Sequence, residues 1–337
     1  MGLEREKNKR ELSLSEAISI LNNPRSSLGE RARVLEWIIR QQDIPAEVKV
    51  KAEAQLNQVI ETALNESEAS LSSVIVSTQI SRKIEETKSN NAPYASEVAT
   101  NLLKEPRFII TDKGTIAYGT DEGFNYKARN EDAVVVHTPT YSFACIDGMG
   151  GMRSGKEAAE ILAGTLLSAF KADIDFEQMA TVQTEASRAM AKAGIYEGGA
   201  CYIAAKIVEK PFSMHELQIA QAGDVKLVVF DSGGKIKFET QDEGRGHIVY
   251  NAVTGERPGS TTLGKVFLDK GDRIIVSSDG IWDQMPPEEV AETMQGSLTG
   301  SSFVRIVLET EARMKNSGRG DNRSLIIFDF NPASLKF

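Results

Sequence analysis

Acidic residues flank four apolar, strand-like runs in the C-terminal part of this sequence. Glu131 and Asp132 precede the run AVVV, Asp147 follows YSFAC, Asp279 follows RIIVS, and Asp321 precedes RSLIIF. Carboxylates at the ends of neighbouring strands can converge above one sheet edge, where they repel one another and raise one another's pKa unless a cation lies between them. Mg²⁺ and Mn²⁺ prefer shells of carboxylates, carbonyls and waters. The four sites together predict a divalent-cation centre, although one Asp-Gly pair alone is more typical of a turn.

The loop that begins at Asp147 reads DGMGGMRSGKEAA, and its glycines raise a choice between a phosphate cradle and a metal site. A Walker A loop requires G-x-x-x-x-G-K-[ST], but glutamate follows Lys156 here. The dinucleotide fingerprint G-x-G-x-x-G lacks its third glycine. Glycine beside Asp147 and beside Asp279 lets the backbone approach closely and frees a carbonyl to act as a ligand. The three histidines lie in unrelated surroundings and are expected to be structural or exposed: His137, His215 and His247.

The composition is that of a soluble globular protein. Of the 337 residues, 41% are hydrophobic and 26% charged, and the net charge of −9 argues against a broad nucleic-acid surface. No apolar stretch approaches the roughly 20 residues of a membrane span, and the charged N-terminus lacks the apolar core of a secretory signal. Cys145 and Cys201 each lie in an apolar run and are expected to be buried free thiols in a reducing compartment. We therefore expect a cytoplasmic protein with no nucleic-acid or membrane partner.

Residues 1–104 carry the patterns of amphipathic helices. Two segments match the capping box at a helix start: Ser13 with Glu16, and Ser27 with Glu30. Pro45 suits a first helical turn, and further helices are expected over about 69–87 and 95–104. We expect an all-α module that regulates the remainder of the chain or binds a partner, with a helical extension packed on the main domain as the alternative.

From Arg107 the pattern changes to short apolar runs separated by glycine-rich turns. The runs are FII, AVVV, YSFACI, CYIAAKI, LQIA, KLVVF, DRIIVSS and SLIIFDF. Helical stretches interrupt them at about 155–170 and 177–193. Many strands with few helices between them favour packed antiparallel sheets over a doubly wound parallel sheet. The expected fold class is α+β, with an antiparallel β-sandwich flanked by helices.

Six blocks between residues 127 and 330 resemble, in order, the motifs of the metal-dependent serine/threonine protein phosphatases, the PPM or type 2C family. They are KARNEDA (127–133), DGMGGMRSGKEAA (147–159), GGACYIAAKI (198–207), QAGDVKLVVF (221–230), GDRIIVSSDGIWDQMPPEEV (271–290) and GRGDNRSLIIFDF (318–330). The second block has the form common among bacterial members. The resemblance implies a phosphatase domain of α-β-β-α architecture over 105–337, preceded by the helical module over 1–104.

The resemblance also implies a centre of two Mn²⁺ or Mg²⁺ ions, in which Asp147 bridges both. The remaining ligands implied are the Gly148 carbonyl and, through waters, Glu131 on one ion, and Asp279 and Asp321 on the other. Water activated by the two ions would attack phosphorus directly, without a phospho-enzyme.

Other roles that the resemblance implies fall on residues near these ligands. Asp132 lies in or beside the shell of the first ion. The phosphate-gripping arginine of the family falls at Lys127, a point charge in place of a bidentate fork, and Arg129 is the alternative. Bacterial members often bind a third ion, for which Asp224 and Asp242 are the alternative ligands.

The function implied is hydrolysis of phosphoserine and phosphothreonine in a phosphoprotein substrate. Lys127 favours a rival interpretation, a pseudophosphatase or signalling scaffold of the same fold that binds partners without turnover. The presence of Asp147, Asp279 and Asp321 favours an enzyme. The N-terminal helices predict a regulatory protein partner or self-association.

Overall fold

The computed structural model describes residues 106–123, 130–149, 154–241, 251–295 and 299–332, shorter pieces at 96–99, 243–245, 248–249 and 297, and single positions between 17 and 38. The chain divides into two compact units, residues 1–81 and 82–337. None of the helices described in either unit combines the length and apolar character that crossing a membrane requires.

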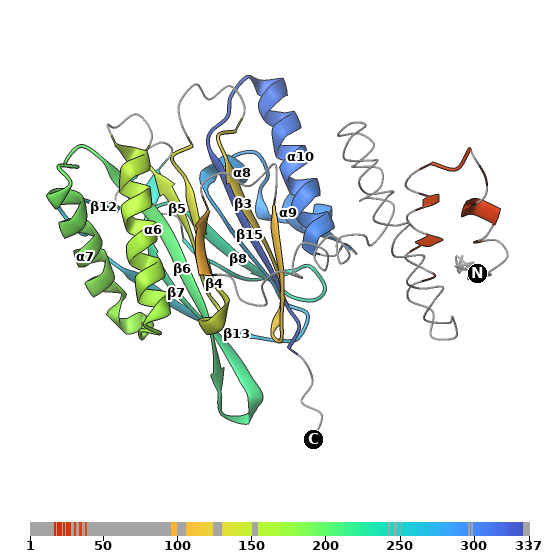
Figure 1. The fold of residues 1–337 in the computed structure, drawn as a ribbon, viewed down its shortest axis with the longest axis horizontal. Helices are drawn as coiled ribbons and strands as arrows, with labels where there is room; N and C mark the ends of the chain where they lie inside the picture. Colours follow the sequence, from red (N-terminus) through yellow and green to blue (C-terminus); the bar gives the residue numbers. More distant parts are fainter. Residues whose placement is uncertain are drawn as a thin grey trace, which may run out of the picture. The chain divides into compact units, whose positions relative to one another are not determined.

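The second unit contains two antiparallel sheets packed face to face (Figure 1). The first sheet has the strand order β1-β4-β5-β6-β7-β13, with β12 paired to β6. Its strands are β1 (Ser96–Ala99), β4 (Ala133–His137), β5 (Ser142–Gly148), β6 (Gly199–Lys210), β7 (Met214–Ala222), β12 (Val253–Thr254) and β13 (Thr262–Leu268). The second sheet has the order β2-β3-β15-β14-β8-β9. Its strands are β2 (Arg107–Thr111), β3 (Gly114–Asp121), β8 (Lys226–Phe230), β9 (Ile236–Glu239), β14 (Arg273–Ser277) and β15 (Arg323–Phe330). The short strands β10 (Gly244–Arg245) and β11 (Ile248–Val249) pair with each other.

Helices cover the outer face of each sheet (Figure 1). On the first sheet lie α6 (Gly155–Lys171) and α7 (Met179–Lys192); on the second lie α8 (Asp279–Trp282), α9 (Pro287–Met294) and α10 (Thr299–Ser317). Short 3-10 helices occupy Thr138–Thr140, Phe176–Gln178 and Pro211–Ser213. In β4, Val134 and Val136 pack between the sheets, whereas Val135 packs toward α6. Burial on both faces explains why this strand reads as an unbroken apolar run. The two antiparallel sheets with outer helices confirm the expected sandwich.

The expected helix over 95–104 is wrong at its beginning. Ser96–Ala99 forms β1, which pairs antiparallel with β4 in the register Ser96↔His137 to Ala99↔Val134. Four residues are too few for a periodicity to distinguish helix from strand, and pairing with the edge of β4 decides the conformation. The first sheet thus includes residues that precede position 105.

The helices α9 and α10 are additional to the two helical stretches expected in this part of the chain. Signals for both are present in the sequence. Pro287 stands at the first turn of α9, followed by two glutamates. In α10, Phe303, Ile306 and Met314 are buried at helical spacing.

The described positions of the N-terminal unit agree in part with expectation. Ala17, Val34, Leu35 and Ile38 are helical and buried. The capping box at Ser27 is confirmed, since the Glu30 N–H donates to Ser27 Oγ (3.2 Å) and the Ser27 N–H donates to Glu30 Oε2 (2.9 Å). The box at 13–16, Pro45 and the helix at 69–87 lie outside the described residues, and the regulatory role of this region stays a prediction.

Candidate metal centre

The predicted metal ligands lie at one end of the sandwich, where strands of both sheets begin or finish. In the first sheet, β4 starts directly after Asp132 and pairs with the last residues of β5, where Asp147 lies. In the second sheet, Asp279 follows β14 and Asp321 precedes β15, and these two strands pair with each other. Acidic side chains from four separate segments therefore share one end of the fold.

Hydrogen bonds join the two sheets at this end, and two of them involve the acidic pair Glu131-Asp132. Ser278 Oγ, which follows β14, donates to Asp132 Oδ2 at 2.7 Å. The Glu131 N–H, which precedes β4, donates to Asn322 Oδ1 at 2.8 Å. The acidic pair Glu131-Asp132 of the first sheet is thus fixed to the strand ends of the second.

Two glycines permit the close approach of these segments. A Cβ at Gly148 would lie 2.5 Å from the carbonyl oxygens of Glu131 and Gly155. A Cβ at Gly280 would lie 1.9 Å from the carbonyl oxygen of Asn322. Such distances exclude any side chain, because real Cβ atoms need more room. Glycine after Asp147 therefore lets the Glu131 backbone pass against Gly148, and glycine after Asp279 lets the Asn322 backbone pass against Gly280.

The carboxylates act on one another electrostatically. Burial raises the pKa of Asp147 well above its usual value, and the charges of Asp132 and Asp279 raise it further. Burial likewise raises the pKa of Asp279, followed by the charges of Asp321 and Asp224. Burial raises the pKa of Glu131 as well, again with a contribution from Asp321. Each group therefore responds to at least one of the others, as expected for a shared site.

Asp132 is the most deeply buried of these carboxylates, with an exposed fraction of 2%. Burial raises its pKa to about 7, and the hydrogen bond from Ser278 acts in the opposite direction. Its Oδ1 atom is buried without a hydrogen-bond partner, as are Glu131 Oε2 and Asp279 Oδ1. Buried carboxylate oxygens without donors are costly unless something positive compensates them.

These features fit hard divalent cations. The donor set consists of oxygen atoms, three of which are buried without protein hydrogen bonds, and mutual repulsion between the carboxylates is what a cation would relieve. Within the described ranges, no three side chains among His, Cys, Asp and Glu are gathered tightly enough to hold an ion by themselves. Waters and backbone carbonyls would complete such a shell, as is usual for Mg²⁺.

Some predicted site residues are not placed. Lys127, Arg129 and Asp242 lie outside the described residues. Met149 lies two residues after Asp147: its N–H donates to the Gly199 carbonyl at 3.0 Å, and a Cβ at Gly199 would lie 2.0 Å from Met149 Cε. The Met149 side chain therefore packs on Gly199 and against the core between the sheets.

Sequence reasoning missed the residues that hold the carboxylates. Ser278 and Asn322 bond to the Glu131-Asp132 segment across the sheets, and Arg323 pairs with Asp121 at the same end of the fold. Ser278 and Asn322 each lie next to a predicted ligand, which was a usable signal. Asp121 and Arg323 are far apart in sequence, and no local pattern connects them.

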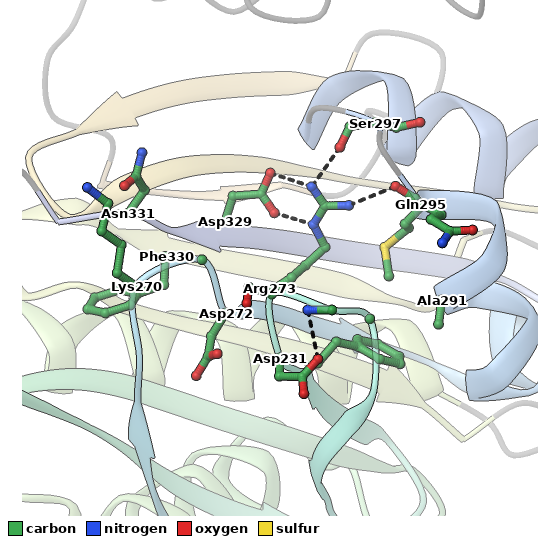
Figure 2. Close-up of a pocket in the computed structure, with 16 residues that line it drawn as sticks. Asp231, Lys270, Asp272, Arg273, Ala291, Gln295, Ser297, Asp329, Phe330 and Asn331 are labelled. Carbon is green, nitrogen blue, oxygen red and sulfur yellow. Dashed lines mark hydrogen bonds and ion pairs between the residues drawn. The ribbon is translucent and has the colours of Figure 1, made fainter. Parts of the chain in front are cut away.

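A cavity of about 790 Å³ lies at the opposite end of the second sheet (Figure 2). It lies where β14 and β15 have their other ends, near Arg273 and Asp329. Figure 2 shows the Arg273 guanidinium directed at the Asp329 carboxylate and at the segment that contains Gln295 and Ser297. Arg273 Nη2 donates to Asp329 Oδ2 at 2.7 Å and to the Ser297 carbonyl at 2.9 Å. Arg273 and Asp329 compensate each other's charge here, which sets this end apart from the carboxylate end.

His137 and His215 are buried and serve the structure. His137 Nδ1 lies 2.7 Å from Thr140 Oγ1, and the His215 ring contacts Phe330 edge-on. His247 lies outside the described residues. Cys145 and Cys201 are free and buried, as expected, and burial raises the pKa of both thiols.

No family model matches the chain. A curated plant protein, the protein kinase and PP2C-like domain-containing protein of Arabidopsis thaliana, is 24% identical over 233 residues, which are 57% of this chain and 35% of that protein. The chain thus spans only about a third of the length of this curated relative.

Several solved structures resemble about two thirds of the chain. The serine/threonine phosphatase PstP/Ppp of Mycobacterium tuberculosis is 20% identical with a TM-score of 0.54, covering 64% of this chain and 98% of that one. The catalytic domain of PstP in complex with two manganese ions is 20% identical with a TM-score of 0.55, covering 64% and 97%. The PPM phosphatase MsPP of Mycobacterium smegmatis, in complex with cacodylate, is 19% identical with a TM-score of 0.55, covering 64% and 98%. At these identities the likeness shows a shared fold.

Proposed function

We propose that this chain, which has the fold of the PPM, or type 2C, serine/threonine phosphatases, is a metal-dependent protein phosphatase. The observation that carries the proposal is the group of mutually repelling carboxylates that both sheets contribute to one end of the sandwich. That end contains three buried carboxylate oxygens without hydrogen bonds. If these carboxylates had only a structural role, nothing would compensate their mutual repulsion or their oxygens without hydrogen bonds.

The residues that would hold two Mn²⁺ or Mg²⁺ ions are Asp147, the Gly148 carbonyl, Glu131, Asp279 and Asp321. Two such ions would lower the pKa of a bound water and offset charge on a phosphoryl group. Asp132 accepts a hydrogen bond from Ser278 and keeps the Glu131-Asp132 segment against the second sheet. A third ion beside Asp224 belongs to the same proposal, since Asp224 raises the pKa of Asp147 and Asp279.

The proposed substrates are phosphoserine and phosphothreonine in a cytoplasmic phosphoprotein, with Lys127 or Arg129 binding the phosphate oxygens. Comparing Lys127→Ala with Arg129→Ala distinguishes them, because the residue that binds phosphate raises KM for a phosphopeptide when it is removed. Residues 1–104 are proposed to regulate the phosphatase, through a partner protein or self-association.

The test is phosphate release from a phosphothreonine peptide by the full-length chain. We expect release with Mn²⁺ and none after chelation with EDTA. Asp279→Asn should slow release about 100-fold or more, equivalent to about 2.7 kcal/mol in the barrier. The matched control is Glu209→Gln, which removes an exposed carboxylate at the far end of β6 from the site and should leave the rate unchanged.

The alternative, a pseudophosphatase, predicts a different pattern in the same assay. It would bind Mn²⁺ and the phosphopeptide without releasing phosphate at any Mn²⁺ concentration. Absence of Mn²⁺-dependent release by the wild-type chain, together with intact folding, would therefore overturn the proposed enzyme activity.

A further inference from the structure

Resting on the function proposed above, we infer that the buried Asp121–Arg323 ion pair is a positioning device for the divalent-cation site. It holds the tripeptide Asp321-Asn322-Arg323, named here the 321–323 tripeptide, in position. Within this tripeptide, Asp321 is a proposed cation ligand and Asn322 bonds to the first sheet. Asp121 and Arg323 are positioning residues, because neither is proposed to touch an ion or the substrate.

The geometry of the pair is specific. Arg323 Nε donates to Asp121 Oδ1 at 3.0 Å and Arg323 Nη2 donates to Asp121 Oδ2 at 2.6 Å. This two-bond fork fixes the relative position of β3 and β15 at their site end. Arg323 Nη1 reaches α10, donating to the Val307 carbonyl at 3.0 Å and to Thr310 Oγ1 at 3.3 Å. One guanidinium thus connects two strands and a helix.

The neighbouring residue carries this positioning to the first sheet. Asn322 Oδ1 accepts from the Glu131 N–H at 2.8 Å, and Asn322 Nδ2 donates to the Glu122 carbonyl at 3.2 Å. Asp121 Oδ1 also accepts from the Gly123 N–H at 2.9 Å. The chain that leaves β3 and the chain that enters β4 are therefore both attached to the 321–323 tripeptide. The spacing between Glu131 and Asp321, on opposite sheets, follows from these bonds.

The burial of the pair favours positioning over stability. The side chains of Arg323 and Asp121 are only 3% and 9% exposed. Desolvation of two buried charges offsets much of their attraction, and apolar residues of similar size often stabilise a fold equally well. What apolar residues do not supply is a directional, two-bond link between strands. The pair is therefore expected to fix geometry more than to add stability.

A second Arg–Asp fork on the same strand provides a matched control. Arg273 and Asp329 pair at the far end of β14 and β15, with side chains 16% and 23% exposed. Arg273 also bonds to α10, donating to Ser302 Oγ at 2.9 Å. Thr299 Oγ1 donates to Asp329 Oδ2 at 2.6 Å. Both forks join β15 to a neighbouring strand and bond to α10, but they lie at opposite ends of the sheet, and the second is less buried.

The experiment measures Mn²⁺ binding to full-length chains by calorimetry, alongside thermal unfolding without metal. We expect the double variant Asp121→Leu/Arg323→Met to stay folded and to bind Mn²⁺ at least tenfold more weakly than the wild type. The control double variant Asp329→Leu/Arg273→Met should bind Mn²⁺ as the wild type does. In phosphate release, the first variant should need more Mn²⁺ for half-maximal rate, with a smaller change in kcat at saturation.

A conservative variant keeps the inference testable if the double variant unfolds. Arg323→Lys retains the charge but loses the fork, and we expect three- to tenfold weaker Mn²⁺ binding from a folded chain. The inference is overturned if the folded Asp121/Arg323 variants bind Mn²⁺ with wild-type affinity, or if the control variant loses as much affinity for Mn²⁺ as they do. Failure of the wild type itself to bind Mn²⁺ would instead overturn the proposed function.

Discussion

The two ends of the second sheet contain the same kinds of residue in different electrostatic arrangements. At the cavity end, acidic groups meet basic partners: Asp329 pairs with Arg273, and Asp269 and Asp272 pair with Lys237 at 2.7 and 2.6 Å. At the opposite end of the fold, Glu131, Asp132 and Asp279 each keep a buried oxygen without a hydrogen bond. Both ends are built on β14 and β15.

The difference separates structural acids from acids available to a ligand. A carboxylate that accepts bonds from arginine or lysine is compensated by the chain itself. Carboxylates that raise one another's pKa are compensated only by protonation or by a cation. The Asp121–Arg323 pair lies at the carboxylate end, but the charge of Asp121 is compensated by an arginine of the chain itself. This combination suits a positioning role.

Catalysis should show the largest contrast between the two ends. Asp147→Asn removes the carboxylate proposed to contact both ions, and we expect phosphate release to fall about 100- to 1000-fold, or about 3–4 kcal/mol in the barrier. Asp329→Asn should change the rate less than threefold at 25 °C. Initial rates of phosphopeptide hydrolysis with saturating Mn²⁺ measure both, and equal losses would contradict the division between the ends.

Stability without metal should respond with opposite sign at the two ends. Asp329→Asn leaves Arg273 without its charged partner and should lower the free energy of unfolding by about 2 kcal/mol. Asp279→Asn removes like-charge repulsion and should leave the free energy of unfolding unchanged or raise it by about 1 kcal/mol. Urea denaturation in EDTA measures both, and a loss of stability in Asp279→Asn would remove the case for repulsion.

The pH dependence of stability sharpens the same contrast at Asp132. The folded pKa of Asp132 is about 7, above the unfolded value of about 3.9. Between these values the folded chain binds more protons than the unfolded chain, so the Asp132 contribution falls as pH rises from about 4 to about 7. In EDTA, the unfolding free energy of the wild type minus that of Asp132→Asn should decline across this window. A difference that stays flat or increases with pH would contradict a raised pKa for the buried Asp132.

The smallest effect should come from the lining of the cavity. Lys270 is exposed at the cavity rim, and Lys270→Ala should change the free energy of unfolding by no more than about 0.5 kcal/mol. Phosphate release should be unchanged. A marked loss of activity would show that the cavity end takes part in catalysis.

The sequence predicted the candidate ligands because each acidic residue lies beside an apolar run, and the end of a run marks the end of a strand. The structure places Asp132, Asp147, Asp279 and Asp321 at such ends. Local pattern did not reveal the Asp121–Arg323 fork, because the two residues meet only after β3 and β15 pair.

The strand Ser96–Ala99 was missed for a related reason. Its four residues carry no alternation strong enough to oppose a helical interpretation, and its conformation follows from pairing with β4. Positions fixed by local chemistry were therefore predictable, whereas positions fixed by tertiary pairing were not.

Mn²⁺ titration of the full-length chain by calorimetry tests the central claim most directly. The account predicts that the wild type binds at least two ions, that Asp147→Asn binds them at least tenfold more weakly, and that Asp329→Asn binds as the wild type does. No binding by the folded wild type, or equal weakening by the two substitutions, would contradict the assignment of the metal centre to the carboxylate end.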